Sequence, residues 1–308
     1  MLGSALCRAL GRTSTELFTP AMTFSWDSEA DFEIQVTAAV KAFADRSADA
    51  GRWEIYWAAG VSHMGSSAAD LSRETRALST LIRRIGSEKR LKRSSGAMAF
   101  ASSAGAVYAG SPAGVITENT ILAPTTAYAR EKLLQEDLMR SFMASNGPPV
   151  VLARLSTVYG AGQSAGKPQG LLTHIARCVL RNRAVHIYVP LDTIRDYIFS
   201  DDAAAVMVNA LRGATDMSHA LTMIVASEYP TTIAEIIAIF KKINRRAPRV
   251  VTSAGTMSAV YSRSIQFQSL AVPECARLTK TRLPVGIAKL LASERDSFVR
   301  TSTPARSF

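Results

Sequence analysis

Residues 101–108 read Ala-Ser-Ser-Ala-Gly-Ala-Val-Tyr, and residues 124–132 read Pro-Thr-Thr-Ala-Tyr-Ala-Arg-Glu-Lys. The apolar run 97–101 that leads into them is short and follows a glycine, which is typical of a buried parallel strand. The residues after the proline have the pattern of a helix. Tyr128 and Lys132 are four positions apart and therefore share one face of that helix. The stretch predicts a strand that ends in two hydroxyls, followed by a helix that carries a phenol and an ammonium group.

These residue types favour proton transfer on an alcohol. A phenol with a pKa near 10 is a poor base at neutral pH. The Lys132 ammonium, one helical turn away, favours the phenolate and is expected to lower the pKa of Tyr128, and a bound nicotinamide cation would act in the same direction. The hydroxyl of Ser103, or of its neighbour Ser102, can hold the substrate oxygen. The residues therefore predict a site that moves a proton while a hydride leaves the same carbon.

A Tyr-x-x-x-Lys pair alone is common by chance, but a strand ending in Ser-Ser about 25 residues upstream makes coincidence less plausible. The whole arrangement resembles the extended short-chain dehydrogenase/reductases, in particular the nucleotide-sugar epimerases and dehydratases. Further stretches resemble the same family in order along the chain, from Gly3 to about residue 245. They are residues 57–60 (Trp-Ala-Ala-Gly), 154–160 (Arg-Leu-Ser-Thr-Val-Tyr-Gly) and 195–202 (Arg-Asp-Tyr-Ile-Phe-Ser-Asp-Asp).

The resemblance implies a role for each matching residue. Tyr128 is the acid/base, Lys132 lowers its pKa and holds the nicotinamide ribose, and Ser103 binds the reacting oxygen with Ser102 as the alternate. The residues implied to bind NAD, with NADP as an open alternative, are Gly3, Ala58, Ala59, Gly60, Tyr128, Lys132 and Ser156. The residues implied to face the diphosphate of a nucleotide sugar are Thr157, Lys167 and Arg195. No metal site is implied.

Some of these assignments have a plain structural alternative. Arg195 could pair with a surface carboxylate, and Lys167 could simply be solvated. Asp27 lies near the distance at which an acid holds the adenosine ribose, but a helix N-cap is the stronger interpretation. Thr157 and Glu74 stand about where the family has asparagines.

The resemblance implies an NAD-dependent nucleotide-sugar epimerase. In such an enzyme the cofactor takes a hydride from the substrate and then returns it. Elimination chemistry is disfavoured, because residues 104–106 (Ala-Gly-Ala) supply no acid after the catalytic hydroxyl. A nucleotide-sugar reductase is the alternative within enzymes. A catalytically inactive nucleotide-sensing or scaffold protein on the same fold is the alternative outside them.

The order of elements predicts an α/β fold, a Rossmann-like doubly wound parallel sheet with a smaller α/β substrate lobe. Residues 1–160 and 194–227 are expected to form the NAD(P)-binding domain, and residues 161–193 and 228–308 the lobe. The expected strands are 53–59, 97–101, 150–155, 185–189, 194–199, 221–226 and 249–251, with one or two more within 16–26. The expected helices are 3–10, one capped by residues 27–28, 70–85, one following 126, 171–180, one capped by Asp201, and 232–244. Beyond residue 253 the pattern is weak, and 301–308 resembles a frayed tail.

The beginning of the chain departs from the family. The resemblance places Gly3 as the third glycine of a phosphate-binding turn, but the preceding strand and the first two glycines are not in the sequence. We expect in-frame DNA upstream of Met1 to encode an apolar strand followed by Gly-x-x-Gly.

Composition limits the partners. The chain has 308 residues, a net charge of +11 and three cysteines without metal-ligand spacing. No apolar run approaches 18 residues, so no membrane span is expected. The basic run 83–93 lies where a helix should end, and a solvated helix C-terminus is the more frequent case, so nucleic acid is not expected. The resemblance implies a cytoplasmic homodimer of the kind that serves cell-surface polysaccharide synthesis.

Overall fold

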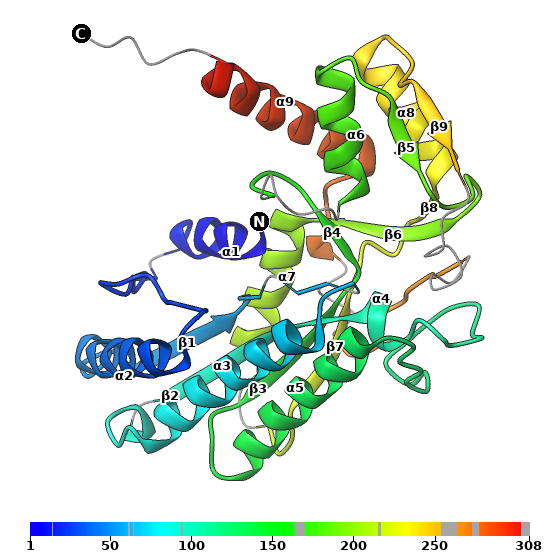
Figure 1. The fold of residues 1–308 in the computed structure, drawn as a ribbon. Helices are drawn as coiled ribbons and strands as arrows, with labels where there is room; N and C mark the ends of the chain where they lie inside the picture. Colours follow the sequence, from blue (N-terminus) through cyan, green and yellow to red (C-terminus); the bar gives the residue numbers. More distant parts are fainter. Residues whose placement is uncertain are drawn as a thin grey trace, which may run out of the picture.

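A parallel sheet with helices on both faces forms the larger part of the molecule (Figure 1). The computed structural model describes residues 1–13, 15–60, 62–63, 65–93, 95–163, 170–214, 217–253, 264–272 and 277–302. The strands are β1 (Arg52–Trp57), β2 (Ser95–Ser103), β3 (Val150–Leu155), β4 (Thr157–Tyr159), β5 (Val185–Ile187), β6 (Ile194–Phe199), β7 (Leu221–Val225), β8 (Pro230–Thr232) and β9 (Val250–Thr252). The helices are α1 (Leu2–Gly11), α2 (Glu29–Arg46), α3 (Ala68–Ser87), α4 (Ala104–Val107), α5 (Ala127–Ala144), α6 (Leu171–Leu180), α7 (Ser200–Gly213), α8 (Ile233–Asn244) and α9 (Leu283–Ser302), with a 3₁₀ turn η1 (Leu91–Arg93).

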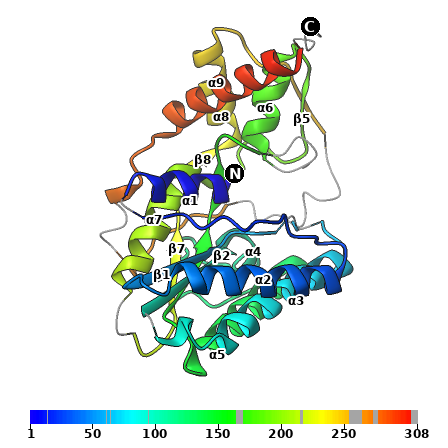
Figure 2. The ribbon, with the colours of Figure 1, turned by 90° about the vertical axis from the view of Figure 1, so that its left-hand side faces the viewer.

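The main sheet has the strand order β1-β2-β3-β7, and every pair in it is parallel. One face packs against α1 and α7, and the other against α2, α3 and α5 (Figures 1 and 2). The two central strands are buried on both sides, which explains why β3 is apolar at nearly every position. This confirms the doubly wound α/β fold. Because all four strands are parallel, their carboxyl ends meet at one edge, where Ser103 and Leu155 are register partners.

Two smaller sheets lie beyond that edge. The order β4-β6-β8 forms one, and β5 pairs with β9 in the other. Helices α6, α8 and α9 pack around these strands on a second apolar core that includes Ile175, Ile187, Ile236 and Leu290. Figures 1 and 2 show this second group of elements stacked on the carboxyl-end side of the main sheet.

The expected strands within residues 16–26 are wrong. The described part of this segment has no strand, because its aromatic side chains pack separately on neighbouring helices and strands instead of alternating. Phe18 packs edge-on against Phe43 of α2, while Phe24 and Trp26 pack against Phe32 of the same helix.

Helix caps were partly predicted. The Ser28 hydroxyl accepts a hydrogen bond from the Asp31 amide and caps α2, with Asp27 just outside the helix. The prediction that Asp201 caps α7 is wrong, since the N-cap is Phe199 and Asp201 lies in the first turn, where it pairs with Arg8. Helix α9 was missed altogether, because only three of its side chains, Ile287, Leu290 and Leu291, are buried apolar residues.

None of the described helices is both long and apolar enough to cross a membrane. The thiols of Cys7 and Cys178 are free, the first exposed and the second buried. Cys275 lies outside the described residues.

Candidate functional site

The carboxyl end of β2 and the first turn of α5 meet at the edge of the main sheet. Ser103 is the last residue of β2, and Tyr128 lies in the first turn of α5. The helix starts there because the Thr126 hydroxyl accepts a hydrogen bond of 3.1 Å from the Ala129 amide. Ser103 and Tyr128 are close enough that the Ser103 hydroxyl favours the phenolate and acts to lower the pKa of Tyr128. The structure therefore brings together the hydroxyl and the phenol that the sequence singled out.

Lys132 lies one turn further along α5 and is almost fully buried. Its Nζ is 5.8 Å from the centroid of the Tyr128 ring and 5.2 Å from that of Phe100. Nζ donates a hydrogen bond of 2.9 Å to Oε1 of Gln135. Burial lowers the pKa of Lys132, while the charges of Glu74, Glu136 and Glu131 oppose that shift. Lys132 is thus adjacent to the phenol ring.

The expected lowering of the Tyr128 pKa is not what the protein alone produces. Burial raises the pKa of Tyr128 to about 12, and the charge of Glu74 raises it further, against the effect of the Ser103 hydroxyl. Desolvation of the phenolate outweighs the groups that favour it. A positive charge brought in with a ligand would be needed to lower it.

Ser102, the alternate hydroxyl, belongs to a different network. Its Oγ donates a hydrogen bond of 2.6 Å to Oε1 of the fully buried Glu136. The Arg154 guanidinium holds the same carboxylate through Nε at 3.0 Å and Nη2 at 2.7 Å. Arg154 Nη1 also donates to the hydroxyl of Tyr108 at 2.5 Å, and Arg140 reaches Glu136 Oε2 at 2.9 Å. Ser102 is therefore engaged in a buried ion-pair network and not with Tyr128.

Four of the residues expected to bind a cofactor line one cavity. Gly3 at the start of α1, with Ala58, Ala59 and Gly60 after β1, border a space of about 360 Å³. Gly60 has φ +135°, and a Cβ there would lie 2.8 Å from Oε2 of Glu74. The cavity is of the size of small ligand pockets, and the N-terminus of α1 presents backbone N–H groups there.

Glu74 forms one wall of the same cavity and is 6% exposed. Its Oε1 accepts a hydrogen bond of 2.6 Å from the amide of Ser62, which ties α3 to the loop after β1. The sequence marked Glu74 only as a departure from an asparagine. Its electrostatic effect on Tyr128 and Lys132 was missed, because Glu74 lies on α3 while the other two lie on α5.

Ser156, also expected near the cofactor, is buried directly after β3. Its amide donates to the Val225 carbonyl at 2.9 Å, and its hydroxyl faces the carboxylate of Asp196. Burial raises the pKa of Asp196 against the hydrogen bonds that its carboxylate receives from the Ser227 amide and hydroxyl. Within the described residues, the Ser156 hydroxyl has no partner at hydrogen-bond distance. Ser156 does not border the cavity formed by Gly3 and residues 58–60.

The residues expected to bind a diphosphate lie on the strands beyond the sheet edge. Thr157, exposed at the start of β4, is the register partner of Tyr197 on β6. Arg195 lies two positions before Tyr197 on that strand and donates a hydrogen bond of 2.7 Å to the Ile194 carbonyl. Thr157 and Arg195 therefore belong to one small sheet. Lys167 lies outside the described residues.

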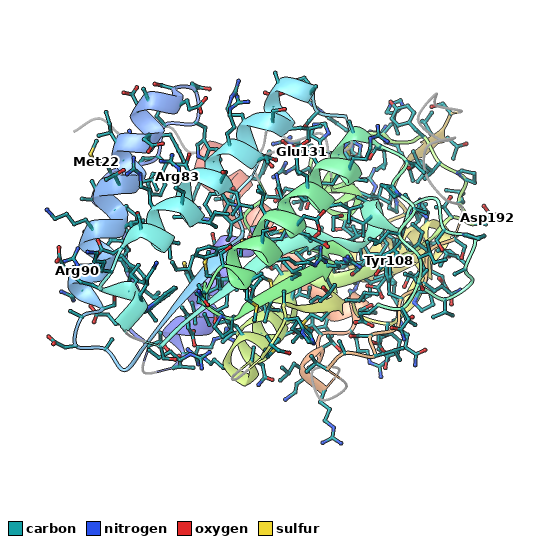
Figure 3. The ribbon with its side chains drawn as sticks, turned by 90° about the horizontal axis from the view of Figure 1, so that it is seen from below. Met22, Arg83, Arg90, Tyr108, Glu131 and Asp192 are labelled. Atoms are coloured by element: carbon teal, nitrogen blue, oxygen red, sulfur yellow. The ribbon has the colours of Figure 1, made fainter. Side chains whose placement is uncertain are left out.

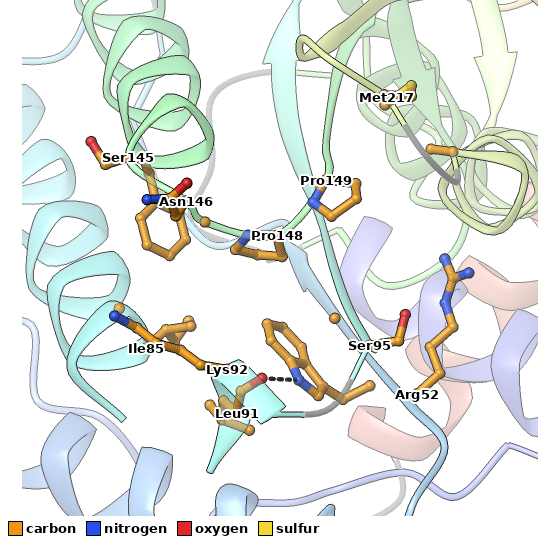
Figure 4. A pocket seen from close by; sticks show the side chains of 16 residues that line it. Arg52, Ile85, Leu91, Lys92, Ser95, Ser145, Asn146, Pro148, Pro149 and Met217 are labelled. Atoms are coloured by element: carbon orange, nitrogen blue, oxygen red, sulfur yellow. Dashed lines mark hydrogen bonds between the residues drawn. The ribbon is translucent and has the colours of Figure 1, made fainter. Parts of the chain in front are cut away.

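A larger cavity of about 690 Å³ lies at the opposite, amino-terminal end of the main sheet (Figure 4). Trp53 lines it, and its indole Nε1 donates a hydrogen bond of 3.1 Å to the Leu91 carbonyl. Pro148 and Pro149 also line it (Figure 4). None of the predicted catalytic residues borders it. The chemistry-bearing groups, rather than the cavity size, place the candidate site at the carboxyl ends of the strands.

Among the described residues, no group of three or more His, Cys, Asp or Glu side chains is arranged to hold a metal ion.

Several known proteins of similar sequence or fold are named as sugar-nucleotide epimerases. The dTDP-L-rhamnose 4-epimerase of Burkholderia thailandensis is 30% identical over 89 residues, 29% of this chain and 24% of that enzyme. This match spans about a quarter of the relative's length. The UDP-glucose 4-epimerase of Thermotoga maritima, solved with UDP-glucose, shares the fold at a TM-score of 0.78 with 18% identity, covering 97% of this chain and 96% of that one. The UDP-glucose 4-epimerase of Thermus thermophilus, solved with NAD, gives a TM-score of 0.74 at 19% identity and covers 96% of each chain.

A family model matches most of the chain. It covers residues 1–226, which include the main sheet and every predicted catalytic residue. The solved structures, at under 20% identity, support the fold, and the family match supports the relationship. The chain belongs to the NAD dependent epimerase/dehydratase family.

Proposed function

We propose that this chain is an NAD-dependent nucleotide-sugar epimerase. The observation that carries the proposal is the placement of Ser103 at the carboxyl end of β2 beside the first turn of α5, where Ser103 acts on the pKa of Tyr128 and Lys132 Nζ lies 5.8 Å from the centroid of the phenol ring. This is the edge at which open α/β sheets bind their ligands. The family match and the epimerases of similar fold support it.

The residues present fit a dinucleotide cofactor. Small residues at positions 3 and 58–60 leave a cavity of about 360 Å³ at the N-terminus of α1, where a pyrophosphate would meet backbone N–H groups. When bound, NAD would supply the hydride-accepting and hydride-donating chemistry that epimerisation of a sugar carbon requires. NADP stays an alternative, because Arg73 and Asp70 on the same cavity wall carry opposite charges.

The roles of the chain's own residues follow from their contacts. Ser103 would hold the sugar oxygen, and the Tyr128 oxygen would accept its proton and later give it back. Because burial and Glu74 hold the pKa of Tyr128 at about 12, the positive charge of a bound cofactor, beside the Lys132 ammonium, would be needed to favour the phenolate. Thr157, Arg195 and Lys167 are proposed to bind the substrate diphosphate, with guanidinium contacts to phosphate oxygens the strongest of the three.

Epimerisation is favoured over elimination. Elimination needs an acid beside the catalytic hydroxyl, but Ala104, Gly105 and Ala106 form the short helix α4 directly after Ser103. None of the three can donate a proton through a side chain. We also propose that residues 161–193 and 228–308 act as the substrate lobe, and that the protein is a cytoplasmic homodimer serving cell-surface polysaccharide synthesis.

The test is a Tyr128→Phe variant, assayed with NAD or NADP and a panel of UDP- and dTDP-sugars by NMR of the sugar product. We expect wild-type protein to interconvert one epimer pair without net change in the cofactor. The variant should lose turnover by several orders of magnitude but retain cofactor binding by calorimetry. Tyr188→Phe, which removes the hydroxyl of an exposed tyrosine, is the matched control and should keep wild-type rates.

Each other outcome points to a different function. Wild-type turnover in Tyr128→Phe would sink the site assignment. Net consumption of reduced cofactor would favour the reductase. Binding of cofactor and sugar nucleotide without turnover by the unmodified chain would favour the non-catalytic scaffold.

A further inference from the structure

The positive charge of the chain is concentrated in one part of it. Residues 1–160 and 194–227 contain 19 basic and 19 acidic residues and are formally neutral. Residues 161–193 and 228–308 contain 17 basic and 6 acidic residues. The whole net charge of +11 therefore belongs to these second segments.

Within them, seven cations gather at one place, which we call the basic tip. It consists of Arg181, Arg183, Lys241, Lys242, Arg245, Arg246 and Arg249, all exposed. Parallel pairing of β5 with β9 joins the two chain segments, with Val185 opposite Val250. The Val185 amide donates to the Arg249 carbonyl at 2.7 Å, and the Arg249 guanidinium donates to the Asn182 carbonyl. Figure 1 shows α6, α8, β5 and β9 together at one end of the molecule, on the far side of β6 from α4 and α5.

Carboxylates are scarce around the tip. None of the seven cations takes part in an ion pair within the described residues, and the sequence has no Asp or Glu between positions 138 and 191 or between 236 and 273. The basic run at the end of α3 behaves differently. Arg83 and Arg84 pair with Glu33, and Arg90 pairs with Asp45 and Glu88 (Figure 3 labels Arg83 and Arg90).

Exposed apolar side chains border the tip. The Arg181 guanidinium lies 5.8 Å from the centroid of the Phe298 ring on α9. Phe298 and the next residue, Val299, are 40% and 57% exposed, and Val251, two residues after Arg249, is 44% exposed. Clustered cations beside exposed apolar side chains are the composition of a surface that meets the headgroup region of an anionic bilayer. Bases could stack on Phe298, but the valines offer no ring to stack on, so the pattern favours lipid over nucleic acid.

We propose that the basic tip docks the protein on the surface of a bilayer that contains anionic phospholipids. The cations lie near the phosphate groups, and Phe298, Val299 and Val251 enter the boundary between headgroups and acyl chains. Docking of this kind needs no membrane-spanning helix. The tip lies on the far side of β6 from α4 and α5, the elements next to the candidate site (Figure 1).

The experiment is co-sedimentation of the full chain with vesicles of phosphatidylcholine, either alone or mixed with phosphatidylglycerol, at low and at physiological salt. The tip variant combines Lys241→Gln, Lys242→Gln, Arg245→Ser and Arg246→Ser. The control variant combines Arg12→Gln, Lys41→Gln, Lys92→Gln and Arg130→Gln, which removes the same charge from exposed positions outside the tip. Thermal unfolding checks that both variants stay folded.

We expect binding to the anionic vesicles only, weakened about 100-fold or more by the tip variant, since each Lys or Arg near such a surface contributes substantially. The control variant should bind nearly as the wild type does. Arg245→Lys with Arg246→Lys should retain binding, because a bilayer attracts charge without requiring guanidinium geometry. Phe298→Ser with Val299→Ser should weaken the binding that survives at physiological salt.

Two outcomes would overturn the proposal. Equal loss in the tip and control variants would show that only net charge matters. Tight binding of a single-stranded oligonucleotide at physiological salt, with vesicle binding indifferent to Phe298→Ser and Val299→Ser, would assign the tip to nucleic acid instead.

Discussion

Two clusters, one half-buried and one buried, lie side by side where β2 meets α5, and each contains a serine, a tyrosine and a cation. One is Ser103, Tyr128 and Lys132. The other is Ser102, Tyr108 and Arg154, joined by Glu136. The difference is the carboxylate. Glu136 accepts hydrogen bonds from Arg154 and Ser102 and so fixes the second cluster, while the hydrogen bond that Lys132 donates in the first cluster goes to the neutral amide of Gln135. The Arg154 charge, which is paired with a carboxylate, therefore stabilises the fold. The Lys132 charge, whose hydrogen bond goes to a neutral amide, is available to a ligand.

The electrostatics of the two clusters follow the same distinction. Burial raises the pKa of Glu136. The hydrogen bonds and charge of Arg154, the hydrogen bond from Ser102 and the charge of Arg140 outweigh burial, and the pKa is lowered overall. Glu136 therefore stays ionised, and its contribution to stability is lost only as the pH falls through that lowered pKa. Tyr128 has the opposite balance, since burial and Glu74 raise its pKa to about 12.

The largest expected effect comes from breaking the matched cluster. Arg154→Met removes the two hydrogen bonds to Glu136 and the one to Tyr108 that come from a guanidinium 5% exposed. It leaves Glu136, with a side chain 0% exposed, only Ser102 and Arg140 as partners. The free energy of unfolding should fall by about 3–5 kcal/mol, measured by urea denaturation. The double variant Arg154→Met, Glu136→Met should recover part of that loss. A double variant less stable than the single one would contradict the account of Glu136 as a charge that Arg140 alone compensates incompletely.

The second prediction concerns the hydroxyl of the other cluster. Ser103→Ala removes the group proposed to hold the reacting oxygen, so kcat should fall by about 10²–10³-fold, the range for a lost oxygen-binding donor. The free energy of unfolding should hardly change, because Ser103 is only half-buried. Steady-state kinetics beside urea denaturation gives both values. A stability loss without a kinetic one would assign Ser103 to the fold.

Ser102→Ala is the matched change one residue earlier, and the expected result is reversed. Glu136 Oε1 loses the hydroxyl donor and keeps the Arg154 Nε donor, so the free energy of unfolding should fall by about 1 kcal/mol. Activity per folded molecule should stay near the wild-type value. A kcat loss equal to that of Ser103→Ala would mean that the two adjacent serines share the substrate oxygen.

The smallest effect is expected at Glu74. Its charge raises the pKa of Tyr128, so Glu74→Gln should let the phenolate form at lower pH. Absorbance titration of the phenolate, with Tyr128→Phe subtracted, follows this in the unliganded protein. Glu131→Gln removes an equal charge that acts on Lys132 and not on Tyr128, so it should leave the titration in place. An unchanged Tyr128 titration in Glu74→Gln would mean that burial alone sets its pKa.

The sequence predicted the elements that are apolar and regular. The run of residues 150–155 became β3 at the expected bounds, and the helix at 171–180 became α6. Prediction from the sequence was wrong where buried side chains do not recur at regular intervals, at the aromatic residues of 16–26 and at α9. The proximity of Ser103, Tyr128 and Lys132 could be predicted because their spacing along the strand and helix is fixed, while their catalytic roles stay a prediction. The role of Glu136 could not, since its partners Ser102 and Arg154 come from other elements and are separated from it by 34 and 18 residues.

The uneven distribution of charge has a consequence for how assays of this protein will behave. One part of this molecule is formally neutral and the other is strongly positive, so the molecule attracts small anions from a distance. Salt screens that attraction, with a screening length of roughly 10 Å at 0.1 M ionic strength. Proton transfer between buried groups is shielded from the same salt. Ionic strength should therefore affect substrate binding but not the chemical step. We expect kcat/KM for an anionic sugar nucleotide to fall as the ionic strength rises, while kcat stays constant. Laboratories using different buffers would then obtain different apparent affinities from one unchanged site.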